Sequence, residues 1–465
     1  MNPSNSINPI NDLTRGSISK TLLKFALPFL LANFLQAFYC IVDIFIIGKL
    51  GGGSNGVAAI GNGGQILQLL LSLMIGMTTA SSVLVGTYVG AKNTRLVQKS
   101  IGVNISFFVL ISLLTSAPAI LLAPQILVWI HTPPEVIPDA LTYVRICLMG
   151  FVFIMGYNVF AAILRGLGNS KTPLIFVAIA CVLNIALDYL LIACWQWGVK
   201  GAAIATIFSQ GLACLLALAY LARAKDIWPK KRDFLLKKTM LKEILRIGLP
   251  IAAMCVMLDL SFMFIYSVVN KFGLAASAGY SIVNRLNAFT MLPALSFSMA
   301  MSAITAQNLG AGDEPRAVRT LIPGIAYPWF CGLIFLIIMQ IFPQDIIGYF
   351  LHPQTVLRED TIIAGALYIK SFSWEYVLVP LVFVSNGFFN GTGHTMFTMF
   401  NNVLCTFAIR VPATFLLGMA ANATKYTIGF AAPLASFASV GVAALYFWKG
   451  NWHGKPRMLN ISSEE

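Results

Sequence analysis

Twelve apolar runs dominate the sequence, and each is long enough to cross a lipid bilayer as a helix. A bilayer core of ~30 Å needs about 20 apolar helical residues. The runs are continuous and rich in Leu, Ile, Ala and Phe, without the short alternating segments typical of membrane β-barrels. They cover residues 21–48, 57–88, 100–123, 140–164, 173–195, 200–222, 244–270, 274–307, 320–343, 362–389, 396–419 and 426–448. The sequence therefore predicts an all-α polytopic membrane protein with twelve transmembrane helices.

The composition excludes other classes of protein. Only 10% of the residues are charged and 58% are hydrophobic, whereas soluble domains carry roughly 25% charge. The net charge of +14 reflects few acids rather than basic blocks, so we expect no nucleic-acid partner. The eight cysteines lie within apolar runs, and the four histidines lie outside the apolar cores. Neither set has the spacing of a metal or haem site, so we expect no cofactor.

The positions of Lys and Arg predict the orientation in the membrane, because basic residues are retained on the cytoplasmic side. If the N-terminus is inside, the cytoplasmic segments hold 22 Lys and Arg and the outer segments hold five. We therefore expect both termini to be cytoplasmic.

The chain divides into two similar halves. A basic connector, residues 223–243, separates an N-terminal lobe, 1–222, from a C-terminal lobe, 244–465. Short motifs recur in order across it: Leu27-Pro28 as Leu249-Pro250, Gly90-Ala91 as Gly310-Ala311, Tyr143 as Tyr368, and Gly166-Leu-Gly168 as Gly391-Thr-Gly393. Steady spacing of this kind indicates duplication of a six-helix unit. Because six is even, the two bundles are expected to be related by pseudo-two-fold symmetry about the membrane normal. The alternative is chance matching of Gly and Pro in apolar sequence.

Four acidic residues fall inside the predicted spans: Asp43, Asp188, Asp259 and Glu375. A charge at the centre of a membrane helix costs about 2.5–3.5 kcal/mol on insertion scales. Each of these acids is therefore expected to face protein, water or a cation, and together they form the first set of candidate functional residues.

Asp43 lies on the outer half of the first helix, fifteen residues after Pro28. Proline lacks a backbone N–H and is expected to kink or loosen this helix. A mobile helix that carries an acid would make a gate, with Pro28 as its bend. The alternative is that Asp43 only caps the outer end of the helix.

Asn184 and Asp188 are four residues apart and share one face of the fifth helix. Their carboxylate and amide oxygens would suit Na⁺ or a proton site. If Asp43 approaches Asp188, each carboxylate raises the proton affinity of the other. The alternative is that Asn184 only forms an interhelical hydrogen bond.

Asp259 on the seventh helix and Glu375 on the tenth are the acids of the second half. Arg410, on the eleventh helix, corresponds to the Asn184/Asp188 region of the first half and is able to pair with one of these acids. For these three residues we expect structural charge pairing, with a minor cation site in the C-terminal lobe as the alternative.

The motifs Leu27-Pro28, Val42-Asp43-Ile-Phe-Ile-Ile-Gly48, Arg165-Gly-Leu-Gly168-Asn-Ser-Lys-Thr-Pro173, Asn184-x-x-x-Asp188 and Arg410-Val-Pro412 give the chain a family resemblance. It resembles the multidrug and toxic compound extrusion (MATE) transporters over nearly its whole length. The likeness is to the bacterial branch whose cation site lies in the N-terminal lobe.

This resemblance implies a V-shaped pair of six-helix bundles that exports amphipathic, often cationic compounds while Na⁺ or H⁺ enters. The cation site of that branch corresponds to Asp43, Tyr143, Asn184, Asp188 and Thr206, with Na⁺ expected at Asp43, Asn184, Asp188 and Thr206. Gln36 and Asn158 match positions of the same network or of the substrate cavity. A second branch uses acids on the seventh and tenth helices, but Asp259 is shifted by about one residue and Glu375 lies about a turn early.

The resemblance also implies a multi-pass protein of the bacterial inner membrane, in contact with the lipid bilayer, and we expect a monomer. The alternative function is a flippase for lipids or lipid-linked precursors, a class that usually has extra helices or a more cationic cavity. An embedded acyl- or glycosyltransferase would need a His/Asp cluster or an acid pair at the membrane surface. The sequence has no such cluster, so we expect no enzymatic activity.

Overall fold

The computed structural model describes residues 9–351, 357–419 and 425–454, and within these residues all regular secondary structure is helical. Ten of the described helices are long and apolar enough to cross a membrane. Two helix pairs, bent by 51° and 48°, bring the number of such spans to twelve. The prediction of an all-α fold with twelve spans is therefore confirmed.

The first six spans extend beyond their apolar runs by one to several residues. They comprise α1 (Ile18–Leu50), α2 (Gly53–Gly90), α3 (Thr94–Trp129), the bent pair α4 (Ile137–Met149) and α5 (Phe151–Gly166), α6 (Lys171–Asp188) continued by the π-helix η2 (Tyr189–Cys194), and α7 (Gly198–Arg223). The connector contains a single 3₁₀ turn, η3 (Lys231–Phe234).

The second six spans repeat this plan. They comprise α8 (Lys238–Asn270), α9 (Leu274–Thr290) with α10 (Leu292–Gly310), and α11 (Glu314–Arg319) with α12 (Leu321–Ile341), followed by the short α13 (Pro343–Tyr349). The remainder are the bent pair α14 (Arg358–Phe372) and α15 (Glu375–Gly391), α16 (Thr395–Cys405) continued by the π-helix η4 (Thr406–Arg410) and α17 (Val411–Met419), and α18 (Lys425–Ile428) with α19 (Ala431–Lys449).

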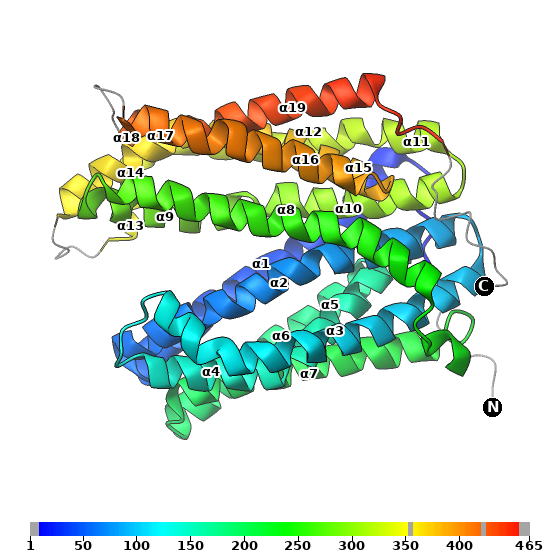
Figure 1. The fold of residues 1–465 in the computed structure, drawn as a ribbon, viewed down its shortest axis with the longest axis horizontal. Helices are drawn as coiled ribbons and strands as arrows, with labels where there is room; N and C mark the ends of the chain where they lie inside the picture. Colours follow the sequence, from blue (N-terminus) through cyan, green and yellow to red (C-terminus); the bar gives the residue numbers. More distant parts are fainter. Residues whose placement is uncertain (1–8, 352–356, 420–424, 455–465) are drawn as a thin grey trace.

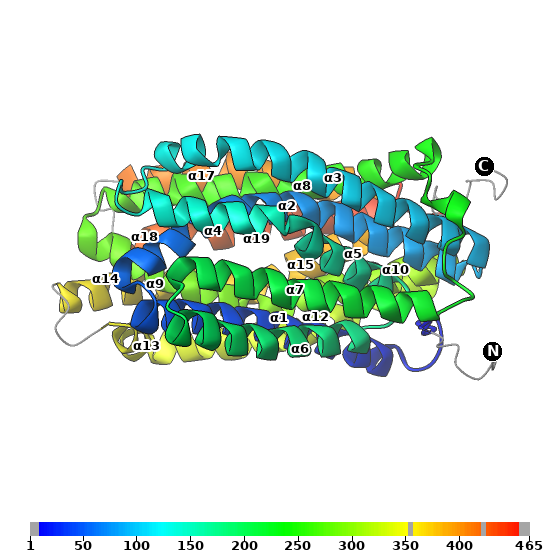
Figure 2. The ribbon, with the colours of Figure 1, turned by 90° about the horizontal axis from the view of Figure 1, so that it is seen from below.

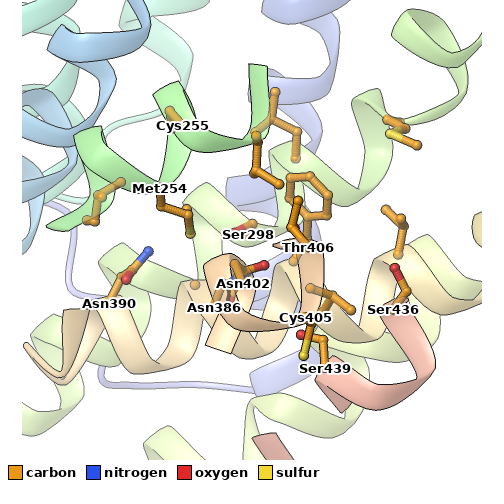
Figure 3. A pocket seen from close by; sticks show the side chains of 18 of the residues that line it. Met254, Cys255, Ser298, Asn386, Asn390, Asn402, Cys405, Thr406, Ser436 and Ser439 are labelled. Atoms are coloured by element: carbon orange, nitrogen blue, oxygen red, sulfur yellow. Dashed lines mark hydrogen bonds between the residues drawn. The ribbon is translucent and has the colours of Figure 1, made fainter. Parts of the chain in front are cut away.

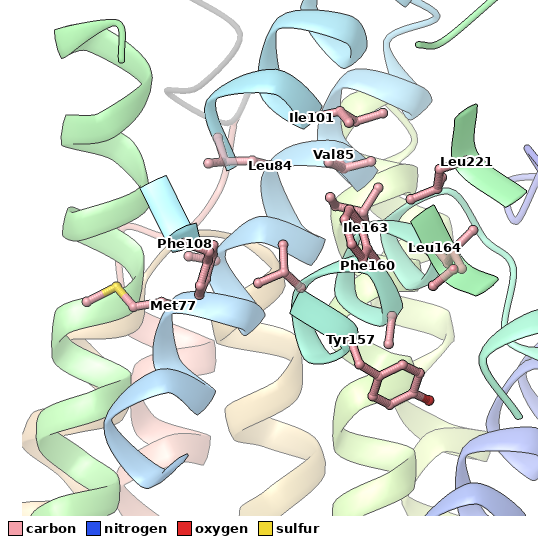
Figure 4. Packing of buried hydrophobic residues seen from close by; sticks show 14 of the residues in the cluster. Met77, Leu84, Val85, Ile101, Phe108, Tyr157, Phe160, Ile163, Leu164 and Leu221 are labelled. Carbon is pink, nitrogen blue, oxygen red and sulfur yellow. The ribbon is translucent and has the colours of Figure 1, made fainter. Parts of the chain in front are cut away.

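The helices run side by side in two bundles, with the ends of the described chain on one side of the molecule (Figures 1 and 2). Figure 1 shows α1 to α7 in one bundle and α8 to α19 in the other, with α1 and α2 on the side of the first bundle that faces the second. The end that carries both termini and the connector is called the basic end below. The core of the first bundle is built from bulky side chains of α2, α3, α5 and α7, among them Phe108, Phe160 and Leu221 (Figure 4).

The first halves of α1 and α8 each pack against the opposite bundle. Leu22, Phe25 and Phe29, in the first half of α1, are buried against α10 and α15 of the second bundle. The second half of α1 contributes Ile46 and Ile47 to a cluster within the first bundle. The first half of α8 does the reverse, because its buried residues join the core of the first bundle. Each of these two helices therefore ties the bundles together.

The chain before α1 also joins the bundles at the basic end. The Asn11 backbone N–H donates to the Leu167 carbonyl (2.8 Å), next to α5 of the first bundle. Leu13 is buried in the core of the second bundle, and its N–H donates to the side-chain oxygen of Gln307 on α10 (3.1 Å). The Gln307 amide nitrogen donates in turn to the Gly166 carbonyl (2.8 Å). One buried side chain thus satisfies backbone groups on both sides of the junction.

The connector is held to the first bundle by an ion pair. Asp233 is fully buried and accepts two hydrogen bonds from the Arg95 guanidinium, at 2.6 and 2.7 Å. Burial by itself would raise the pKa of the Asp233 carboxyl. The hydrogen bonds from Arg95 and the Lys230 N–H, with the charges of Arg95 and Arg232, outweigh burial and hold this pKa below its usual range.

Candidate functional site

Two carboxyl groups meet inside the first bundle. Asp43, half-buried on the second half of α1, and Asp188, the fully buried last residue of α6, are neighbouring carboxyl groups. Oδ1 of Asp43 and both carboxyl oxygens of Asp188 are buried without a hydrogen-bond partner. Two neighbouring carboxylates inside a protein repel each other unless a proton or another cation lies between them.

Asn184 adds a third polar group one helical turn before Asp188. Its side chain is 1% exposed, and neither its amide oxygen nor its amide nitrogen has a hydrogen-bond partner. The interhelical hydrogen bond that offered the alternative explanation for Asn184 is therefore not formed. The helix changes to π geometry directly after Asp188, at Tyr189, and such π turns are frequent at functional sites.

A small cavity of about 10 Å³ adjoins Asn184, which is about the space that one water molecule or small ion needs. Its polar lining includes Gln36, Tyr39 and Gln210. Gln210 on α7 is 9% exposed, and its side-chain oxygen has no partner. Sequence reasoning missed Tyr39 and Gln210. Tyr39 lies one helical turn before Asp43, and Gln210 is an amide inside an apolar span, so both signals were present.

Three other predicted residues of this lobe make no described hydrogen bond with the acid pair. The Tyr143 ring packs against α2, where a Cβ atom at Gly63 would lie 3.0 Å from it. The Thr206 hydroxyl donates to the Ala202 carbonyl (3.0 Å), and the Asn158 amide donates to the Ile154 carbonyl (2.8 Å). The Thr206 hydroxyl and the Asn158 amide therefore donate within their own helices. The side-chain oxygens of both residues are still able to accept a hydrogen bond or to bind a cation.

Pro28 is buried in the half of α1 that packs on the second bundle, and α1 continues as a helix through it. Pro28 therefore does not break α1, and its role as the bend of a gate stays a prediction.

A larger cavity, of about 240 Å³, lies in the second bundle (Figure 3). Its walls come mainly from α8, α10, α15, α16 and α19, and Ile75 and Thr79 of α2 line it from the other bundle. Figure 3 shows Met254 on the α8 side and Asn386, Asn402 and Ser439 on the opposite side. The cavity is therefore largely apolar, with a few polar groups on its lining.

Glu375 and Arg410 line this cavity, and the sequence had left open which acid of this lobe Arg410 would pair with. The described ion pairs, whose N···O distances are 4.0 Å or less, do not include one between Arg410 and an acid. Glu375 instead accepts a hydrogen bond from Ser436 (2.7 Å), and the Arg410 guanidinium lies 4.4 Å from the centre of the Phe262 ring. The bend between α14 and α15 places Glu375 at a helix start, which the apolar pattern does not disclose.

Asp259 is separated from these two residues. It is exposed on α8, does not line the cavity, and lies beside the Ser72 hydroxyl of α2. Asp259 therefore does not share the cavity with Glu375 and Arg410, because this part of α8 directs it toward the first bundle.

The fold and the buried polar groups define a polytopic α-helical membrane transporter. The MatE family matches this chain twice, over residues 28–190 and 250–416, once in each half. The chain belongs to the multidrug and toxic compound extrusion (MATE) family, and it is a transporter rather than an enzyme.

Named relatives agree with this assignment. The chain is 30% identical over 448 residues to a probable multidrug resistance protein of Bacillus subtilis, YpnP, covering 95% of this chain and 97% of that protein. It is 24% identical to a probable multidrug resistance protein of Thermotoga maritima, NorM, covering 86% of each chain.

Solved structures share the fold. A multidrug resistance MATE family transporter in an outward-facing conformation aligns with a TM-score of 0.85 at 21% identity, covering 93% of this chain and 96% of the other. A variant of the Vibrio cholerae MATE transporter VcmN aligns with a TM-score of 0.86 at 19% identity, covering 94% and 98% of the two chains.

Proposed function

We propose that this protein exports amphipathic or cationic compounds in exchange for H⁺ or Na⁺, and that the ion binds between Asp43, Asp188 and Asn184. The observation that carries the proposal is the carboxyl pair, in which Oδ1 of Asp43 and both oxygens of Asp188 are buried without a hydrogen-bond partner. A proton shared between the two groups, or a Na⁺ ion held by their oxygens and the Asn184 amide oxygen, removes the repulsion between them.

The path of α1 supports coupling between ion binding and movement of the bundles. Asp43 lies on the half of α1 that packs in the first bundle, whereas Phe25 and Phe29 on the other half pack in the second. Asn33, between these halves, donates a hydrogen bond to Ser296 of α10 (3.0 Å). A change of position at Asp43 is therefore transmitted along one helix to the other bundle.

Export requires that the ion favour one conformation, because equal affinity for both would shift nothing. In the proposed cycle, an ion entering from outside binds the carboxyl pair and favours release of the exported compound. Return of the ion to the cytoplasm restores the repulsive pair and resets the bundles. The excess of Lys and Arg at the basic end supports a cytoplasmic location for both termini and thus the outward direction of export.

The test is efflux of ethidium from proteoliposomes in which the Na⁺ and H⁺ gradients are varied separately. Asp43→Asn and Asp188→Asn are expected to reduce gradient-driven export at least tenfold. Asp259→Asn is the matched control, because Asp259 lies outside the pair, and this variant is expected to retain export. Full gradient-driven export by either carboxyl variant would disprove the proposal. Scrambling of labelled lipid without ethidium export would instead identify a flippase.

A further inference from the structure

The cavity of the second bundle presents two opposite charges that do not touch. Glu375 is 4% exposed and Arg410 is 8% exposed, and both line the cavity. The second carboxyl oxygen of Glu375, Oε2, and Nε of Arg410 are buried without a hydrogen-bond partner. A buried charge that lacks a partner destabilises a protein strongly, so the geometry calls for groups of opposite charge inside the cavity.

The internal repeat places Arg410 opposite the Asn184/Asp188 region of the first bundle. The Gly166/Gly391 match has an offset of 225 residues, so Arg410 corresponds to a position between Asn184 and Asp188. A π-helical segment adjoins this region in each bundle, since η2 begins directly after Asp188 and η4 ends at Arg410. In this region the first bundle therefore carries an acid and the second carries a base, which is a reversal of charge.

This reversal changes the kind of ligand that the cavity accepts. The first bundle presents two carboxyl groups and suits a small cation. In the second bundle, the guanidinium of Arg410 opposes a lone cation, and the carboxylate of Glu375 opposes a lone anion. A molecule that carries both charges satisfies both residues, because guanidinium binds a carboxylate or phosphate and carboxylate binds an ammonium group.

The remaining lining favours an apolar body on such a ligand. Leu258, Leu295 and Phe383 line the cavity with the side chains of Met254 and Met299. Methionine side chains adapt to ligands of irregular shape. The amides of Asn386 and Asn402 hydrogen-bond to each other at 3.0 and 3.3 Å. They are therefore already paired, whereas Oε2 of Glu375 and Nε of Arg410 have no hydrogen-bond partner.

We propose that this cavity is a binding site for an amphipathic zwitterion, whose anionic group pairs with Arg410 and whose cationic group pairs with Glu375. Ile75 and Thr79 of α2 close the cavity from the first bundle, so separation of the bundles would open the site. This inference goes beyond the export cycle proposed above, because it concerns a different lobe and binding without an ion gradient.

Three probes with the same phenylpentyl frame test the proposal: 2-amino-5-phenylpentanoate, 5-phenylpentylamine and 5-phenylpentanoate. Their charges differ, as zwitterion, cation and anion. Binding is measured by calorimetry on the full chain in lipid nanodiscs at neutral pH, with empty nanodiscs subtracted to remove partition into lipid. Wild type is expected to bind the zwitterion at least tenfold more tightly than either singly charged probe, since a charged hydrogen bond contributes a factor of about 10 to 100.

Single substitutions should change the preference in opposite directions. Arg410→Gln is expected to weaken zwitterion binding at least tenfold and to make the cation the favoured probe. Glu375→Gln is expected to make the anion the favoured probe. In the double variant, Glu375→Gln with Arg410→Gln, the preference for the zwitterion should disappear. An exchange of preference shows that a variant is folded, and equal affinities of wild type for all three probes would overturn the proposal.

Asp188→Asn separates this site from the proposed coupling site. Its export is expected to fail while its zwitterion binding remains that of wild type. If Asp188→Asn exports normally but Arg410→Gln loses the zwitterion, the proposed function fails and this inference stands. If Arg410→Gln keeps the wild-type order of the three probes, the inference fails whatever the export result.

Discussion

Gly90 and Gly310 lie in reciprocal contacts between the two bundles. A Cβ atom on Gly90 of α2 would overlap the Gln307 carbonyl oxygen on α10, and one on Gly310 of α10 would overlap the Thr87 carbonyl oxygen on α2. The internal repeat relates the two glycines. At the basic end, the backbones of α2 and α10 therefore contact each other directly, because neither glycine has a side chain.

Enlarging either glycine should force this contact apart. Gly90→Val and Gly310→Val are each expected to cost about 1–3 kcal/mol as overpacking, and to increase the separation of α2 and α10. The separation is measured by double electron–electron resonance between spin labels at positions 92 and 319. Lys92 and Arg319 are both exposed. Gly441→Val is the control, because no neighbouring atom lies within 4 Å of a Cβ atom there. An unchanged distance in both variants would contradict this account.

Sequence patterns predicted the spans well because burial in lipid imposes one constraint on every residue of a span. The twelve apolar runs correspond to the twelve observed spans, and the repeat that relates Gly90 to Gly310 corresponds to a real contact. The breaks at Gly150 and near Trp374 were missed, because a bent helix and a straight one have the same composition. The packing of α1 and α8 against the opposite bundle was also missed. Apolar residues that face lipid have the same composition as apolar residues that face a neighbouring bundle.

Prediction of the site was limited because the sequence does not specify in which direction a side chain points from its helix. The approach of Asp43 to Asp188 was expected as a possibility, and the structure makes the two carboxyl groups neighbours, but their role as a cation site stays a prediction. Arg410 was expected to be able to pair with Asp259 or Glu375, and it lines, together with Glu375, a cavity that no local pattern in the sequence describes. The distance between residues on different helices depends on helix rotation, which a sequence of uniform hydrophobicity specifies weakly.

Asn184→Leu tests whether the unpaired amide serves ion binding rather than stability. Because both polar atoms of Asn184 are buried without partners, the substitution is expected to leave stability unchanged or raise it by about 1–2 kcal/mol. The ion concentration for half-maximal ethidium export should rise at least tenfold. Thermal unfolding and export assays measure the two effects.

Asn104→Leu is the matched control for this change. The Asn104 oxygen accepts from Ser81 (2.5 Å), and its nitrogen donates to the Ser100 carbonyl (2.8 Å). Loss of these buried bonds is expected to lower stability by about 1–3 kcal/mol. A large loss of stability in Asn184→Leu would argue for a structural role instead.

Gln307→Leu should weaken the junction at the basic end. The substitution leaves the Leu13 N–H and the Gly166 carbonyl without the partner that both share. Two buried unpaired groups are expected to cost about 2–4 kcal/mol in total. Thermal unfolding measures the loss, and Gln98→Leu, on a partly exposed side chain, is expected to change stability less. Equal effects of the two substitutions would count against the bridging role of Gln307.

The Arg95–Asp233 pair predicts a dependence of stability on acid pH. Because the pKa of Asp233 is lower in the folded protein than in the unfolded chain, its contribution is complete above the unfolded value, about 3.9. This contribution is lost as the pH falls through the folded value.

Asp233→Asn should therefore be less stable than wild type at pH 7 by about 3–5 kcal/mol, and the difference should shrink below about pH 4. The measurement is the midpoint of thermal unfolding in detergent between pH 3 and 7. A difference that stays constant over this range would show that the Asp233 charge is not responsible. Asp226→Asn, at an exposed position of the same connector, provides the comparison.

The crossing of α1 and α8 also bears on how such a protein is assembled. Each half-chain supplies one helix whose first turns pack only when the other half is present. If the chain were divided within the connector, neither half would therefore be expected to fold stably alone. The two halves would have to be produced together in one cell so that each could pack against the other. An ancestor with a single six-helix unit would have met the same requirement by pairing two identical copies.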